Sequence, residues 1–147
     1  MITVGQSFEW AKRAGWYSFD LGYAVAADDA GNAYISGKYE KDASFGNARV
    51  TCAGNHDIYL AKYGPDGSFK WVRTAGGVSG DYAHAMDCDG AGNIYITGEI
   101  ERTVKFGSVT LTGNGSNDVF VAKYNTNGDL IWAKKLGGSN KSDKGLG

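Results

Sequence analysis

The sequence has 147 residues, including 23 glycines and one proline, and its formal net charge is −1. This near-neutral balance gives no electrostatic reason to expect a nucleic acid or an anionic membrane surface as a partner. No apolar run approaches the roughly 20 residues needed to span a bilayer. Because each glycine destabilises a helix interior by about 1 kcal/mol, the composition favours short strands joined by tight turns and argues against helices.

An internal repeat organises the chain. Trp10, Trp71 and Trp132 follow one another at intervals of 61 residues, and laying 8–68 on 69–129 needs no gap and gives 24 identities. A repeat of this length is typical of an architecture built from copies of one supersecondary unit. The predicted units are 8–68, 69–129 and the start of a third, 130–147.

Each unit is predicted to contain four strands. Short gaps rich in Gly, Asn and Asp join them, and these residues favour tight antiparallel hairpins because they accept positive φ. The first unit has candidate strands at Tyr23–Asp28, Ala33–Tyr39, Asp57–Tyr63 and Ser68–Thr74. The second has them at His84–Asp89, Ile94–Ile100, Asp118–Tyr124 and Asp129–Leu136. One further copy of the fourth strand, Phe8–Ala14, precedes them all.

A long excursion separates the second and third strands of each unit, at Glu40–His56 and Glu101–Asn117, and we expect a small hairpin there. Apolar side chains occur on both faces of the strands, whereas a sheet with one wet face would alternate apolar with polar residues. The prediction is therefore an all-β fold: two four-stranded antiparallel β-propeller blades plus one extra strand. Two blades cannot close a ring of about 4–8, so closure requires a longer parent chain or oligomerisation.

The motifs resemble those of the SBBP family, the bacterial beta-propeller repeat proteins. The residues that carry the resemblance are Asp28–Gly37, Asp57–Tyr63 and Gly67–Trp71, with Asp89–Gly98, Asp118–Tyr124 and Gly128–Trp132 in the second unit. The Gly-x-x-x-Trp step also looks like the tryptophan-docking step of quinoprotein propeller repeats. The resemblance implies a secreted or cell-surface bacterial protein and no particular task. Residues 1–5 lack the pattern of a signal peptide, so this localisation rests on the resemblance alone.

The repeated turns carry Asp28 and Asn32 in the first unit and Asp89 and Asn93 in the second. Their spacing partly resembles a calcium loop, but Gly98 stands where the bidentate Glu is required. We interpret all four as structural turn residues whose oxygens accept backbone hydrogen bonds. No metal and no cofactor are predicted.

Other repeated carboxylates have structural interpretations too. Asp57 and Asp118 open the third strands and are expected to cap turns. Asp20 and Asp81 precede the first strands and are expected to tie neighbouring units together.

No catalytic residue is predicted. His56 and His84 have no matched Cys, Ser or carboxylate in the sequence that would suggest a triad or a zinc site, so we interpret them as loop or packing residues. Cys52 and Cys88 occupy non-equivalent positions of the repeat. We expect free thiols there, with a disulfide as the alternative.

The aromatic residues divide into two groups. Trp10, Trp71 and Trp132 obey the repeat and are predicted to be core residues between blades. Trp16, Tyr17 and Phe19 break it, since Gly77, Val78 and Gly80 stand at the equivalent positions. They either fill space at a blade junction or form a ligand-binding surface for a glycan or a protein.

The favoured function is a non-enzymatic structural and interaction module. Its partners would be further copies of the chain or the remaining blades of a parent chain. One alternative is a carbohydrate-binding, lectin-like propeller that uses Trp16, Tyr17 and Phe19. The other is a fragment of a propeller enzyme whose active site lies in other blades.

Overall fold

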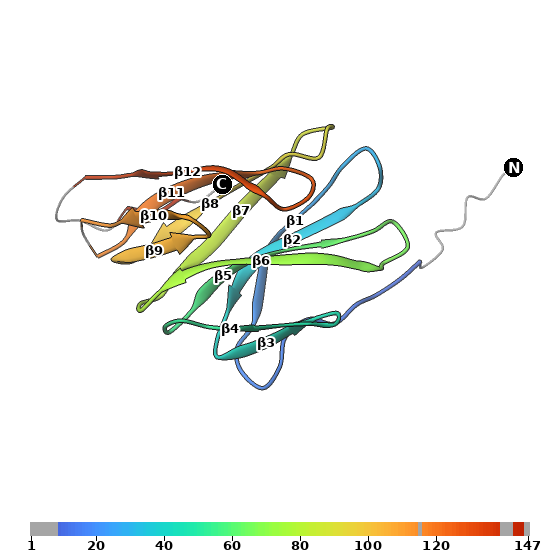
Figure 1. Ribbon diagram of the computed structural model, residues 1–147, viewed down its shortest axis with the longest axis horizontal. Coiled ribbons are helices and arrows are strands. Elements are labelled where there is room, and N and C mark those ends of the chain that lie inside the picture. Colours follow the sequence, from blue (N-terminus) through green and yellow to red (C-terminus); the bar gives the residue numbers. More distant parts are fainter. Residues whose placement is uncertain (1–8, 115, 139–142, 146–147) are drawn as a thin grey trace, which may run out of the picture.

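A computed structural model describes residues 9–114, 116–138 and 143–145. These residues form twelve strands in antiparallel sheets and no helix, which confirms the predicted all-β class. The strands lie in two main sheets, one above the other in Figure 1, and each main sheet contains the four principal strands of one repeat unit. Within the described residues the sheets do not close into a barrel or a ring, so the propeller arrangement stays a prediction.

The first sheet has the strand order β1-β2-β5-β6-β9-β10, in which β9 and β10 come from the second unit, and the second sheet has the order β7-β8-β11-β12. In the first, β1 is Leu21–Ala27, β2 Ala33–Tyr39, β5 Asp57–Tyr63 and β6 Phe69–Gly77. In the second, β7 is Tyr82–Cys88, β8 Ile94–Ile100, β11 Asp118–Tyr124 and β12 Leu130–Leu136. The central strands β2, β5, β8 and β11 have the predicted bounds. The edge strands differ from the prediction by up to three residues at an end. In β1 and β7 a bulge at Tyr23 or His84 shifts the pairing with the second strand.

The two excursions form the expected hairpins, and the hairpin of the second unit lies beside the fourth strand of the first. β3 (Asp42–Phe45) pairs with β4 (Ala48–Thr51), and β9 (Thr103–Phe106) pairs with β10 (Val109–Thr112). In the second unit β9 also pairs with the end of β6, where Ala75 lies opposite Phe106. The unit therefore contains six strands rather than the predicted four, and its hairpin links it to its neighbour.

The predicted extra strand Phe8–Ala14 is not formed in the described residues. Phe8 lies outside them, and residues 9–13 are not in a strand. Ala14 alone forms an isolated bridge, with Phe45 of β3. The physical reason is that β6 and β12 already occupy the outer edges of β5 and β11, which are the edges that a fourth strand requires.

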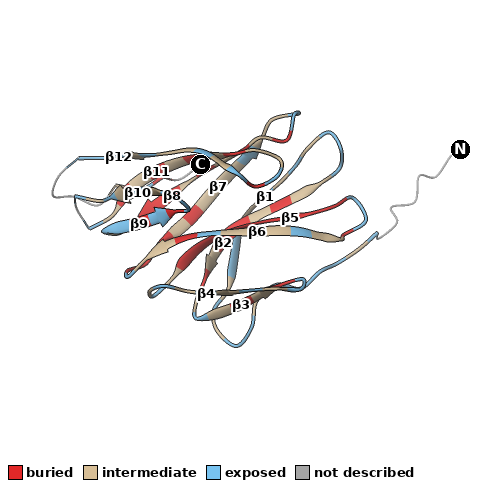
Figure 2. Ribbon diagram, in the orientation of Figure 1, coloured by how far each residue is buried: buried red, intermediate tan, exposed pale blue. Residues whose placement is uncertain are grey.

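The core lies between the two sheets and is made by side chains that follow the repeat. Tyr34, Ile58 and Leu60 of the first sheet belong to one buried cluster with Ile96 and Phe120 of the second. A separate cluster lies on the other side of the first sheet, where the β3–β4 hairpin packs on Tyr59 and Tyr63. Figure 2 shows the buried residues concentrated on the inner strands and the exposed ones toward the outer strands and loops.

Each sheet also has a face turned away from the other sheet. We call the outer face of the first sheet the Val25 face; it carries Val25, Ile35 and Tyr63. The outer face of the second sheet, the Val121 face, carries Tyr95, Val121 and Leu136. The β3–β4 hairpin and Trp10 cover part of the Val25 face.

Candidate binding surface

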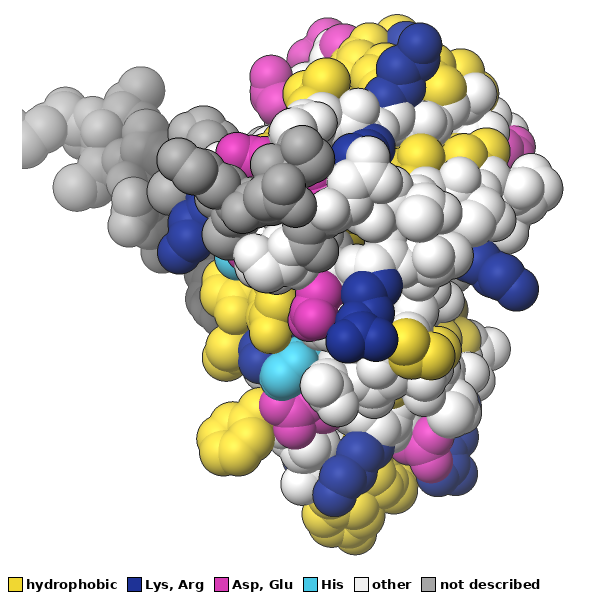
Figure 3. Space-filling view, turned by 90° about the vertical axis from the view of Figure 1, so that its left-hand side faces the viewer, with side chains coloured by type: hydrophobic (Ala, Val, Ile, Leu, Met, Phe, Trp, Pro, Cys, Tyr) yellow, Lys and Arg dark blue, Asp and Glu magenta, His cyan; other side chains and the backbone are white. Residues whose placement is uncertain are grey.

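One end of the two sheets carries Trp16, Tyr17 and Phe19, which break the repeat, together with both histidines. There the fourth strand leads to the next first strand, and the second strand leads into the excursion. Figure 3 views the molecule from this side and shows hydrophobic side chains standing out along one border, beside histidine and acidic groups. Two pairs of repeated carboxylates fix its backbone.

The first pair ties the connecting loops to the ends of the second strands. Asp81 accepts the backbone N–H groups of Gly77 and Glu101, both at 3.0 Å. Asp20 accepts those of Trp16 at 2.8 Å and Glu40 at 3.4 Å. Asp81 is fully buried, and this burial raises the pKa of its carboxyl to about 7. The Asp81 carboxyl thus joins the end of β6 to the second unit.

The second pair stabilises the return from the excursion. Asp57 accepts the N–H of Ala53 at 2.8 Å, and Asp118 accepts that of Asn114 at 2.7 Å. Lys135 of β12 also forms an ion pair with Asp118 at 3.3 Å. Burial raises the pKa of Asp57.

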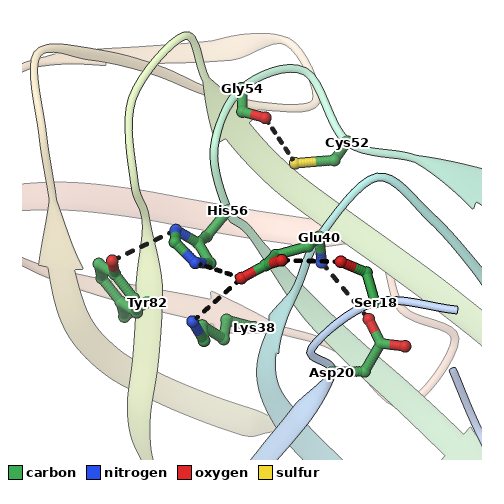
Figure 4. A network of polar contacts seen from close by, with 8 residues as sticks. All are labelled: Ser18, Asp20, Lys38, Glu40, Cys52, Gly54, His56 and Tyr82. Atoms are coloured by element: carbon green, nitrogen blue, oxygen red, sulfur yellow. Dashed lines mark hydrogen bonds and ion pairs between the residues drawn. The ribbon is translucent and has the colours of Figure 1, made fainter.

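A polar cluster lies at the junction of the two units, around Glu40 (Figure 4). The Glu40 carboxylate is 2.7 Å from His56 Nε2 and 3.7 Å from Lys38 Nζ, and it accepts a 2.7 Å hydrogen bond from the Ser18 hydroxyl. The Tyr82 hydroxyl of the second unit lies 3.4 Å from His56 Nδ1. The hydrogen bond from Ser18, together with His56 and Lys38, holds the pKa of Glu40 below its ordinary value.

The second histidine extends this cluster on the other side of Tyr82. The rings of Tyr82 and His84 are stacked, with their centroids 5.8 Å apart and an interplanar angle of 3°, and the centroid of the His56 ring lies 5.4 Å from that of Tyr82. His84 Nε2 is 3.3 Å from the Glu99 carboxylate, which also accepts a hydrogen bond from Asn117. Both histidines therefore have a carboxylate partner, which the sequence did not indicate.

The sequence contained a signal for this cluster that its interpretation missed. Each His and its Glu are 15 or 16 residues apart in the sequence, so local spacing does not connect them. However, most members occupy positions where the two units differ, and these positions converge at one end of the fold. The pairs of repeat-equivalent residues are Leu21 and Tyr82, Tyr23 and His84, Lys38 and Glu99, and His56 and Asn117.

The off-repeat aromatics lie beside this cluster and face solvent. Trp16 is 49% exposed, Phe19 73% and Tyr17 92%. Tyr17 and Phe19 line a shallow hollow of about 430 Å³ together with Ser18, Glu40 and Lys41. Exposed aromatic rings thus adjoin a carboxylate, a hydroxyl and an ammonium group at this hollow.

At the opposite end, the repeated turns carry the four Asp and Asn residues. Asp28 accepts the N–H of Asn32 at 2.9 Å and its side-chain amide at 2.8 Å. Asp89 accepts the same two groups of Asn93, both at 2.8 Å. All four residues thus serve the geometry of their own turns.

The repeated tryptophans are half-buried, less than a core position would imply. The side chain of Trp71, a residue of β6, packs on the turn between β11 and β12 and donates its indole N–H to the Thr126 carbonyl at 3.2 Å. Trp10 lies on the turn between β5 and β6 and donates to the Pro65 carbonyl at 2.9 Å. Trp132 contacts the Tyr95 ring, with a centroid distance of 6.5 Å. Trp10 therefore contacts the first unit, and Trp71 contacts the second.

Cys52 and Cys88 are free and half-buried. Burial raises the pKa of the Cys52 thiol to about 11 and also raises that of Cys88, so neither is an activated nucleophile.

No protein-family model matches this sequence, and no curated protein is significantly similar to it. Within the described residues no three His, Cys, Asp or Glu side chains are grouped so as to hold a metal ion. The same part of the chain contains no helix long and apolar enough to cross a membrane.

Proposed function

We propose that this chain is a non-enzymatic interaction module: a pair of β-propeller blades whose two outer faces bind further blades. The packing of one repeat sheet on the other supports the proposal, because it resembles the contact between neighbouring blades. The exported bacterial setting belongs to the same proposal and rests on the SBBP-like motifs.

The observation that carries the proposal is a difference in exposure between repeat-equivalent residues. Ala75 of the first sheet is 2% exposed under the second sheet, whereas its equivalent Leu136 on the Val121 face is 53% exposed. On the other side, Met86 packs against the core between the sheets, whereas its equivalent Val25 is 72% exposed. The chain thus presents two apolar faces of the kind that it buries internally. Burial of such area contributes about 25 cal/mol per Å².

The test is the mass in solution. Light scattering at micromolar concentrations is expected to give a mass well above the 15.6 kDa of one chain, increasing with concentration. A mass of about 16 kDa across the whole range would contradict the proposal, because the open faces would then have no affinity for another blade.

Carbohydrate binding is the second candidate, and the hollow beside Tyr17, Phe19 and Glu40 favours it. Exposed rings can stack on the faces of a sugar, and the neighbouring polar groups can bind its hydroxyls. On a glycan array, Trp16→Ala and Tyr17→Ala are expected to remove binding. The matched control is Val78→Ala, since Val78 is the repeat equivalent of Tyr17 and is also exposed, at 72%. Equal binding by all variants would refute this candidate.

A further inference from the structure

The contact between the two units contains a defined binding position for a tryptophan. Trp71 at the end of the first unit lies on the turn 125–128 of the second, where a side chain at Gly128 would overlap the indole. Gly128 also has a φ of +78°, which favours glycine independently. We call this turn, together with the excursion strand β9 that pairs with β6, a tryptophan seat.

The first unit has the same seat, and the N-terminal segment of the chain occupies it. Trp10 lies on the turn 64–67, where Gly67 has a φ of +72° and leaves the same space for the indole. Ala14 bridges Phe45 of β3 as Ala75 pairs with Phe106 of β9. The N–H of Gly15 donates to the Ser44 carbonyl at 3.0 Å. Residues 10–15, the N-terminal plug, therefore lie where the end of a preceding unit's fourth strand would lie.

A third tryptophan is left without a seat in the described residues. Trp132 is the repeat equivalent of Trp10 and Trp71 and lies on the Val121 face. Beside it, a hollow of about 550 Å³ is lined by Ala85, Tyr95, Thr97 and Val121. On the first sheet the equivalent region is covered, because β7 of the second unit packs against β1 and β2 there.

We infer that the partner of the Val121 face is a second copy of this chain, bound head to tail. The Val25 face of one copy covers the Val121 face of the other in the way that the second sheet covers the first. The β1 strand of one copy then fills the hollow on its neighbour, and Trp132 of the neighbour enters the seat on turn 64–67. This inference rests on the proposed function and adds the partner, the orientation and the role of the plug.

The plug and the incoming Trp132 cannot occupy one seat together, so association requires one segment to leave. Six residue pairs connect β12 to β11. The plug has one β-bridge, the backbone hydrogen bond from Gly15 to Ser44, one indole hydrogen bond and the Trp10–Tyr63 stacking. The plug therefore leaves, and β12 stays on its own sheet. Only chains with a free seat can bind another copy. The apparent dissociation constant is therefore the intrinsic constant divided by the fraction of chains in which the seat is free.

Trp10→Ala and Trp132→Ala replace repeat-equivalent residues of the full chain, and we expect them to change the dissociation constant between copies in opposite directions. Trp10→Ala weakens the plug, and the dissociation constant between copies is expected to fall by about tenfold. Trp132→Ala removes the group that enters the seat, and the constant is expected to rise by about tenfold. Sedimentation equilibrium measures both, with circular dichroism to verify the fold. Leu136→Lys, at an exposed position of the same face, provides a second variant with the same expected direction as Trp132→Ala.

Four outcomes are distinguishable. Opposite shifts for Trp10→Ala and Trp132→Ala support the inference. Association that weakens with Trp10→Ala overturns it, because the plug would then be a strand exchanged between copies. A mass of one chain for the parent and every variant overturns both the inference and the proposed function, whereas association that none of the substitutions changes overturns the inference alone.

Discussion

At the residue scale, the buried carboxyl of Asp81 connects the two units and also couples stability to pH. The folded chain keeps the Asp81 proton up to about pH 7 because burial disfavours the charge. The unfolded chain releases it near pH 4. The stabilising contribution of the neutral form is therefore fully present below about pH 4 and is lost as the pH rises to about 7.

Asp81→Asn tests this coupling. The variant cannot ionise, so the decrease in its free energy of unfolding between about pH 4 and pH 7 is expected to be smaller than that of the parent. One N–H, of Gly77 or Glu101, also loses its acceptor, which costs about 1–3 kcal/mol. Urea titrations at several pH values measure both effects. Parallel pH profiles for parent and variant would show that Asp81 is not responsible.

Lys62 and Lys123 are equivalent in sequence and differ in environment. Each ammonium lies over a tyrosine ring, at 5.1 Å for Lys62 and 4.9 Å for Lys123. Lys62 is only 8% exposed and also donates to the carbonyl and hydroxyl of Thr126 in the other unit. We expect Lys62→Ala to cost about 2 kcal/mol. Lys123→Ala should cost less than about 0.5 kcal/mol, and equal losses in denaturant titrations would contradict the structural role of the Lys62–Thr126 contact.

At the element scale, the bulged pairing of each first strand depends on a glycine in the second strand. A side chain at Gly98 would overlap the carbonyl oxygen of Tyr82 on the neighbouring strand, and Gly37 has the same relation to Leu21. Because backbone must move to relieve the overlap, Gly98→Ala is expected to cost at least about 3 kcal/mol. The control is Gly138→Ala, where an added methyl meets no atom of the described residues within 4 Å. Thermal melts of the two variants compare these costs, and equal melting temperatures would refute the prediction.

The elements also show what the sequence could predict. The repeat, the four central strands and the excursion hairpins follow from periodicity and turn residues, which are local signals. The ends of β1 and β7 depend on a bulge, and the loss of the Phe8–Ala14 strand depends on which edges remain free. The pairing of His56 with Glu40 and of His84 with Glu99 also requires contacts between distant segments, which local patterns do not contain.

At the scale of the whole molecule, the two main sheets cover each other on their inner faces, whereas the Val25 face and the Val121 face carry exposed apolar side chains. Because the units repeat, another copy can make the same contact that the second sheet makes with the first. The two surfaces in this contact are different faces of the chain. Such a heterologous contact gives a ring if its rotation closes and an open filament if it does not. With two units per chain, closed rings of six or eight units require three or four chains.

The measurement that tests this account most directly uses two chains, each with one face blocked. Val25→Glu places a carboxylate on one outer face, and Val121→Glu places one on the other. Either variant alone should stay near 15.6 kDa, because head-to-tail contact needs both faces. An equimolar mixture is expected to form a one-to-one dimer through the two intact faces, as measured by light scattering. Monomers in the mixture, or a dimer of either variant alone, would contradict head-to-tail binding of the two faces.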